Sequence, residues 1–179
     1  MRLKGFDKIE SGTKPAGVRP ARGGFGIRNA LKTDLALLLI RLPVGAVFFA
    51  HGAQKAFGWF GGQGLQKTVE MMSKTYPVIV PYLVSLGEVA AGLGLILGFL
   101  TRVAAAGMFI EMAGAVLLVH WKAGFFAQNQ GFEFPLTLCL VSLAIVVLGP
   151  GSFSFDAARA RNRSRANEVS RRAPVVEGS

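Results

Sequence analysis

A single cysteine, Cys139, is present among the 179 residues, so the chain cannot form an internal disulfide, and a free buried thiol is expected. The sequence also lacks a Cys-x-x-Cys pair, a cysteine and histidine cluster with zinc-like spacing, and the glycine-rich loops that bind phosphates. Its two histidines are too few and too scattered to predict a metal site. None of the common cofactor motifs therefore suggests a function, and the hydrophobic segments become the main source of information.

Long hydrophobic segments dominate the chain: 51% of the residues are hydrophobic and the mean hydropathy is +0.44, which is high for a water-soluble domain. Apolar runs near the length of a bilayer span occupy residues 35–55, 79–100, 103–119 and 134–148. A loop rich in glycine and aromatic residues and a short amphipathic helix at residues 65–72 separate the first two runs. The sequence therefore predicts an all-α fold, a four-helix transmembrane bundle.

The first fifteen residues of the first apolar run, 35–49, carry one charged residue, Arg41. An arginine inside a span is costly unless it finds a partner or reaches water, so its position indicates a polar bundle interior or a function. At 100° per residue, one stripe of this helix contains Arg41, Gly45, Phe48, Gly52 and Lys55, and His51 lies beside it. We expect this stripe to face the other helices and the run to be an uncleaved membrane anchor.

Basic residues are concentrated at the two ends of the chain, whose net charge is +10. We predict a basic, flexible N-terminal tail at residues 1–34, a four-span membrane domain at residues 35–156 and a basic, disordered C-terminal tail at residues 157–179. The positive-inside rule places both termini in the cytoplasm. The expected partners of the tails are anionic lipid headgroups and not nucleic acid.

Two acids lie within predicted spans: Glu88 in the second and Glu111 in the third. A glutamate at that depth is either protonated or paired. We predict that Arg41 pairs with Glu88 or Glu111 in the bundle interior. Such a pair could simply fix the register of the helices, or it could belong to a functional site.

A second polar group is expected at the opposite end of the bundle, where His51 and Lys55, His120 and Glu133 come from three spans. A histidine near a carboxylate and a lysine can relay protons or hydrogen-bond a quinone carbonyl. These four residues are therefore candidate quinone contacts. The alternative is that His120, beside Trp121, is only an interfacial residue.

Several short motifs occur in a recognisable order. They are Arg41 in the first span, His51-Gly52-Ala53-Gln54-Lys55, Glu88 followed by Gly92, Gly94 and Gly98, Thr101-Arg102, and the ending Gly149-Pro150-Gly151-Ser152-Phe153-Ser154-Phe155-Asp156. Their order and spacing resemble the DoxX family over residues 35–156, with both tails outside the match. The resemblance implies a four-helix, multi-pass protein of the bacterial inner membrane. It also implies kinship with DoxD, the membrane component of a thiosulfate:quinone oxidoreductase.

Three classes of function remain open. The favoured one is a membrane subunit of a redox system that interacts with quinone and with a soluble enzyme carrying the redox cofactor, with no covalent cofactor on this chain. The others are a small transporter or proton-conducting bundle, and a scaffold that recruits soluble enzymes through the basic tails. Candidate catalytic residues are Arg41, His51, Lys55 and Glu88, and both a single copy and an oligomer fit the sequence.

Overall fold

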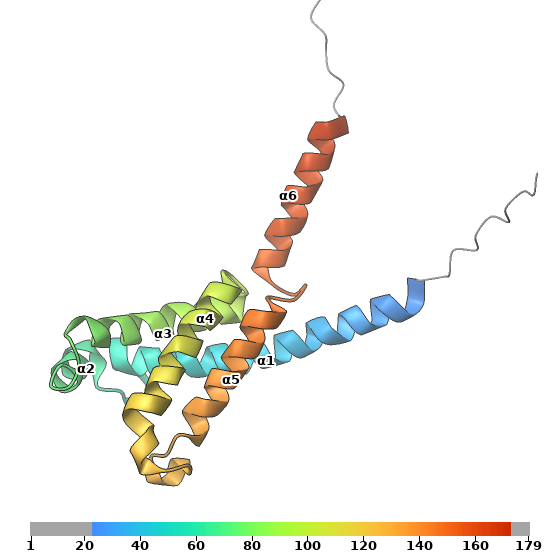
Figure 1. The fold of residues 1–179 in the computed structure, drawn as a ribbon. Coiled ribbons are helices and arrows are strands. Elements are labelled where there is room, and N and C mark those ends of the chain that lie inside the picture. The colour runs from blue at the N-terminus through green and yellow to red at the C-terminus, as the bar shows by residue number, and fades with distance from the viewer. Residues whose placement is uncertain (1–22, 173–179) are drawn as a thin grey trace, which may run out of the picture.

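The computed structural model describes residues 23–172, and this part of the chain is all-helical, as predicted, and contains no strand (Figure 1). Its α-helices are α1 (Gly23–Phe57), α2 (Gly64–Met72), α3 (Ile79–Leu97), α4 (Thr101–Gly114), α5 (Glu133–Leu148) and α6 (Phe155–Arg172). Short 3-10 turns occupy Trp59–Gly61, Trp121–Ala123 and Ala127–Asn129, and a π-helical turn, Ala115–His120, directly continues α4.

Three helical segments are long and apolar enough to cross a membrane: Asn29–Phe57, Ile79–Leu97 and Thr101–Ala123. They correspond to the first three predicted spans. The fourth predicted span is the apolar helix α5, which has 16 residues. At 1.5 Å per residue it is about 24 Å long, shorter than the hydrocarbon core of about 30 Å.

The start of α1 differs from the prediction. The helix begins at Gly23, so residues 23–34 are helical although they were assigned to a flexible tail. This segment has no sustained apolar periodicity, so the sequence pattern does not predict a helix there. Once residues 35–57 form a helix, each preceding residue can join it by adding one hydrogen bond, without a new nucleation step. The remaining part of the predicted tail, residues 1–22, lies outside the described residues.

Helices α1 and α3 pack together through glycines. A methyl group on Gly45 would lie 2.9 Å from the Gly92 carbonyl oxygen, and one on Gly52 would lie 2.5 Å from the Val89 nitrogen. A methyl group on Gly92 would collide with the backbone of Phe49. Only glycine permits such close helix contact, as in other small-residue interfaces within membranes.

The predicted inward stripe of α1 is confirmed. Arg41 and Phe48 are almost completely buried, Gly45 and Gly52 are buried, and Lys55 is half-buried. The apolar core around Phe48 combines side chains from α1, α3, α4 and α5, including Leu95, Met108 and Ile145. Cys139 is a buried free thiol, as expected.

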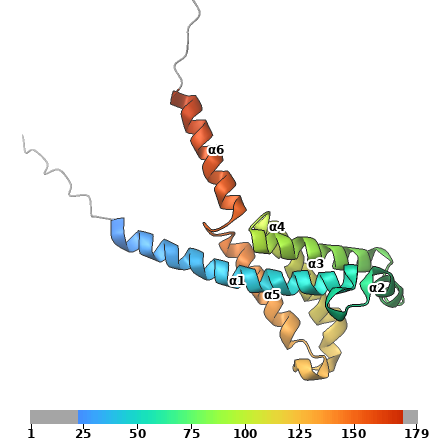
Figure 2. The same cartoon turned by 180° about the vertical axis from the view of Figure 1, so that it is seen from behind.

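Helices α4 and α5 form a second packed pair, which slopes away from the α1 and α3 pair in both views (Figures 1 and 2). A turn at Gly98 joins the pairs. Gly98 has a φ of 68°, and a side chain there would also collide with Ser154 and Arg41. The turn therefore requires glycine for its conformation and for its contacts.

The C-terminal segment also differs from the prediction. Residues 155–172 form α6, which projects from the bundle in both views, whereas disorder was predicted from residue 157 (Figures 1 and 2). The Ser154 hydroxyl accepts a hydrogen bond from the Ala157 amide and caps the helix. The sequence beyond this cap is rich in alanine and arginine, which favour helix even without an apolar face. Residues 173–179 lie outside the described residues.

Candidate functional site

A cavity of about 680 Å³ lies among α1, α3, α4 and α5. Residues of α2 and of the loop before α5 also line it. Five predicted site residues line it: His51, Lys55, Glu88, Glu111 and His120. The rest of its wall is mainly apolar and includes Phe48, Val80, Val84, Ile110, Met112, Leu118, Phe134 and Leu138. We refer to it as the polar cavity. Its volume falls in the usual range for small-molecule sites, about 300–1,000 Å³.

The strongest polar contact in the cavity is an ion pair between Lys55 and Glu88. Lys55 Nζ lies 2.5 Å from Glu88 Oε2, and the Glu88 side chain is 3% exposed. The glycine interface explains why the two residues meet. A methyl group on Gly52 would lie only 2.8 Å from Glu88 Cβ, so the backbone of α1 runs directly against this part of α3. Lys55, one turn after Gly52, is thereby placed beside the carboxylate.

Arg41 does not pair with Glu88 or Glu111, so that prediction is wrong. Its guanidinium donates to the carbonyl of Pro150 and, at 2.7 Å, to the carbonyl of Phe153. The turn between α5 and α6 folds back over α1 at this point and offers carbonyl groups that the sequence alone could not locate. Arg41 does not line the polar cavity.

The same turn is held by Asp156. Its carboxylate accepts hydrogen bonds from the Leu100 amide at 3.0 Å, and from the amide and hydroxyl of Thr101, each at 2.9 Å. Asp156 thus caps the N-terminus of α4 from another part of the chain. Burial acts to raise the pKa of Asp156, but these hydrogen bonds and the nearby charge of Arg41 outweigh it, so the pKa is lowered.

Glu111 extends the Lys55–Glu88 pair from the side of α4. Its carboxyl group lines the same cavity as Glu88 and Lys55 and interacts with both by charge. Two carboxyl groups that face one cavity repel each other when both are ionised, and a proton shared between them removes this repulsion. The cluster of Lys55, Glu88 and Glu111 therefore combines one cation with two acids that can share a proton.

His120 is placed at the cavity by the π-helical turn at the end of α4. Such turns often occur at functional sites because they redirect side chains. His120 Nδ1 lies 2.6 Å from the carbonyl oxygen of Gln130. Because a carbonyl only accepts, Nδ1 carries the proton, and Nε2 of the neutral ring is left as a hydrogen-bond acceptor.

His51 also lines the cavity, and its ring is 6.4 Å from that of Phe134, measured between centroids. Within residues 29–171, no hydrogen bond to the His51 side chain is found. Its imidazole is therefore free to bond to a ligand.

Glu133 was predicted among these contacts, but the structure places it elsewhere. Its carboxylate accepts a hydrogen bond from the Ala127 amide at 2.7 Å, and it does not line the cavity. Position alone suggested its role, since it begins α5 at the same end of the bundle as His120. The short loop needs this acceptor locally, so Glu133 stabilises the loop.

Sequence reasoning missed Met72 and Tyr76, which also line the cavity. Met72 ends α2 and Tyr76 lies in the following loop. The amphipathic pattern of α2 predicts a helix with an apolar face, but does not indicate which part of the bundle that face covers. Only the packing of α2 against α1 and α3 brings these side chains to the cavity.

Comparisons with known proteins agree with this architecture. The DoxX family profile matches residues 36–121. A Bacillus subtilis protein named "Putative oxidoreductase CatD" is 27% identical over 113 residues, which cover 63% of this chain and 79% of that protein. A Mycobacterium tuberculosis protein, described as an uncharacterized membrane protein, is 30% identical over 127 residues, covering 65% of this chain and 76% of the relative. No solved structure matches significantly. The matched family, the relatives and the three apolar helices together show that this chain is a membrane protein of the DoxX family.

Proposed function

We propose that this protein is the membrane subunit of a redox system and that its polar cavity binds the headgroup of a quinone. The observation that carries the proposal is the cluster of Lys55, Glu88 and Glu111 in an otherwise largely apolar cavity that also presents two histidines. A bound quinone would supply two-electron chemistry, taking up two protons on reduction. The chain's own residues would bind and orient the headgroup and exchange those protons.

The donors and acceptors of the cavity suit a quinone. A quinone carries no charge, needs apolar surroundings for its ring and needs hydrogen-bond donors for its two carbonyls. Lys55 and a carboxyl group sharing a proton can donate from one side. In the same cavity, His51 is free to donate, and His120 Nε2 can accept from a hydroxyl. The aromatic ring of Phe134 lies beside His51 and offers a stacking surface.

The membrane arrangement that we propose has four spans and both termini in the cytoplasm of a bacterium, with the protein in the inner membrane. The basic segments before and after the bundle support this orientation under the positive-inside rule. The polar cavity then lies toward the outer half of the bilayer, because it is lined by the end of α1 and the beginning of α3. Helix α5 is short and would span with local thinning of the bilayer.

Electrons would come from a soluble enzyme, since the chain carries no recognisable cofactor motif. The name of the Bacillus subtilis relative, an oxidoreductase, supports a redox context for this proposal. Helix α6 gives the cytoplasmic face a basic surface through Arg159, Arg161, Arg163, Arg165 and Arg171, all of them exposed. We propose that this surface contacts anionic lipid headgroups.

The test is quinone binding to the purified protein in lipid nanodiscs, by titration of a naphthoquinone against the intrinsic fluorescence. We expect saturable binding by the wild type. His51→Ala should weaken it, because the imidazole is a proposed contact of the headgroup. Its loss should leave the fold intact, because this side chain makes no hydrogen bond within residues 29–171. Glu111→Gln should weaken it as well, because one of the two carboxyl groups that can hold a proton in the cavity is lost.

Glu133→Gln is the matched control. It removes the same charge at the same end of the bundle but from a side chain outside the cavity. Its affinity for the quinone should equal that of the wild type. Absence of saturable binding by the wild type would overturn the proposal, as would equal affinity in all four proteins.

A scaffold that recruits soluble enzymes is the second candidate. The observation that favours it is the projection of α6 from the bundle, with its arginines exposed (Figure 2). Deleting α6 should then abolish the cellular phenotype, whereas His51→Ala should leave it unchanged. The quinone proposal predicts a loss of the phenotype in His51→Ala.

A further inference from the structure

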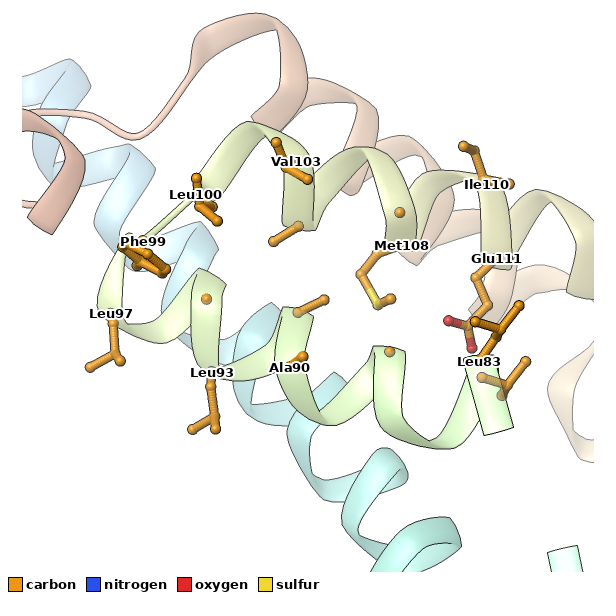
Figure 3. A pocket seen from close by; sticks show the side chains of 16 residues that line it. Leu83, Ala90, Leu93, Leu97, Phe99, Leu100, Val103, Met108, Ile110 and Glu111 are labelled. Carbon is orange, nitrogen blue, oxygen red and sulfur yellow. The ribbon is translucent and has the colours of Figure 1, made fainter. Parts of the chain in front are cut away.

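A second cavity, of about 620 Å³, lies between α3 and α4 (Figure 3). Its walls are formed by large apolar side chains such as Leu93, Leu97 and Val103, and Met108 points into it. Among the described residues, Glu111 is the only ionisable one that lines it, at one end. We call it the apolar groove. It runs along α3 from Leu83 to Leu97, which corresponds to about 20 Å of helix.

Two glycines keep the apolar groove wide. A methyl group added to Gly87 on α3 or to Gly107 on α4 would meet nothing within 4 Å. These glycines are therefore not needed for helix contact, unlike Gly92 on the same helix. A larger residue at either position would fill the groove. Glycine also lowers the stability of a helix by up to about 1 kcal/mol relative to alanine, so these two positions keep the groove open at a cost in stability.

The apolar groove continues into the polar cavity. Val84, Ile110 and Glu111 line both spaces. In Figure 3 the Glu111 carboxylate points into the space between α3 and α4, at the end of the groove where Leu83 lies. A molecule that reached from one space into the other would thus meet the polar cluster at one end and almost purely apolar walls along the rest of its length.

We propose that the apolar groove holds the polyprenyl tail of a quinone whose headgroup lies in the polar cavity. This inference rests on the proposed function and names its substrate class: long-chain, membrane-resident quinones, as opposed to small diffusible ones. The continuity at Glu111 selects this occupant. A ligand with a polar head and a long apolar chain matches a polar cavity that opens into an apolar groove. An apolar helix of a second copy would place no polar group beside the Glu111 carboxyl group at the end of the groove.

The experiment compares menaquinone with a naphthoquinone that has the same headgroup and no tail. Both are titrated against the wild type, Gly87→Leu and Gly107→Leu in nanodiscs. In each variant the Cβ of the new side chain meets nothing within 4 Å, so the protein should fold, which thermal unfolding verifies. We expect the variants to bind menaquinone about tenfold more weakly, a change of about 1.4 kcal/mol, and to bind the tail-less compound like the wild type.

Gly114→Leu is the matched control. Gly114 lines only the polar cavity, and a methyl group there would also meet nothing within 4 Å. This variant should bind both quinones more weakly, because the leucine occupies the space of the headgroup. The contrast separates a filled tail site from a filled headgroup site.

The possible failures are distinguishable. Unchanged menaquinone affinity in Gly87→Leu and Gly107→Leu would overturn the tail site and leave the headgroup site standing. If these variants instead change the oligomeric state, measured by light scattering, the groove binds a second copy and the inference is wrong. If the wild type binds neither compound, the proposed function itself fails, and the tail site with it.

Discussion

Two glycines of α3 serve opposite purposes. Gly92 lies so close to the backbone of α1 that even a methyl group would collide with it. Gly87, which lines the apolar groove, faces open space. The first glycine brings two helices together and places Lys55 beside Glu88, while the second keeps a groove open. A repeated small residue in a membrane helix therefore indicates either contact or space, and only its surroundings decide which.

The ion pair on the closely packed side should give the largest effect. Lys55→Met leaves Glu88, buried at 3% exposure, without its cation and should destabilise the protein by about 3 kcal/mol. The double variant Lys55→Met/Glu88→Gln should recover most of this loss, because no buried charge then lacks a partner. Chemical unfolding in detergent measures both. A double variant as unstable as the single one would show that the pair is not the source of the effect.

A methyl group at the glycine contact should have the next largest effect. Gly92→Ala forces apart two backbones, which cannot rearrange as a side chain could, and should cost about 2 kcal/mol. The same unfolding measurement tests it. Stability equal to that of the wild type would mean that α1 and α3 are less closely packed than the structure has them.

Asp156, which holds the turn between α5 and α6 against the start of α4, should have a pH-dependent effect on stability. Because the pKa of Asp156 is lowered in the folded state, its contribution is complete above the unfolded value of about 3.9 and is lost as the pH falls further. Asp156→Ala should therefore lower stability by about 1 kcal/mol at pH 7, through loss of the helix cap. Thermal unfolding at pH 7 and near pH 3 should show this difference shrinking at the lower pH. A difference independent of pH would contradict the role of the carboxylate.

The smallest effect should have the opposite sign. Gly87→Ala adds a methyl group in open space and removes a flexible residue from a helix, so it should stabilise the protein by about 0.5 kcal/mol. Gly87→Ala and Gly92→Ala are the same substitution on the same helix. Destabilisation of both would show that the groove is closed in the membrane.

Much of the fold could be predicted because it depends on local patterns. Apolar runs locate the helices, and the stripe of Arg41, Phe48 and Lys55 identifies the inner face of α1. Five of the candidate site residues were found because polar side chains within spans are rare and gather in the interior. Those five line one cavity.

The errors concern contacts and elements that the apolar pattern does not indicate. Arg41 was expected to pair with an acid, but carbonyls of the turn before α6 are closer, and only the folded chain brings that turn to α1. Glu133 bonds within its own loop, which a count of residues per span cannot reveal. The hydrophobic pattern does not predict the helix at residues 155–172, because an exposed helix has no apolar stripe.

Photolabelling with an azido-quinone in nanodiscs tests the central claim most directly, because it reports where the headgroup lies. The account predicts labelling of residues around the polar cavity, in the segments 51–55 and 111–120, and protection of these residues by excess unlabelled quinone. Labelling of the lipid-facing residues Leu140 and Val147 instead, without protection, would contradict a quinone site in this cavity.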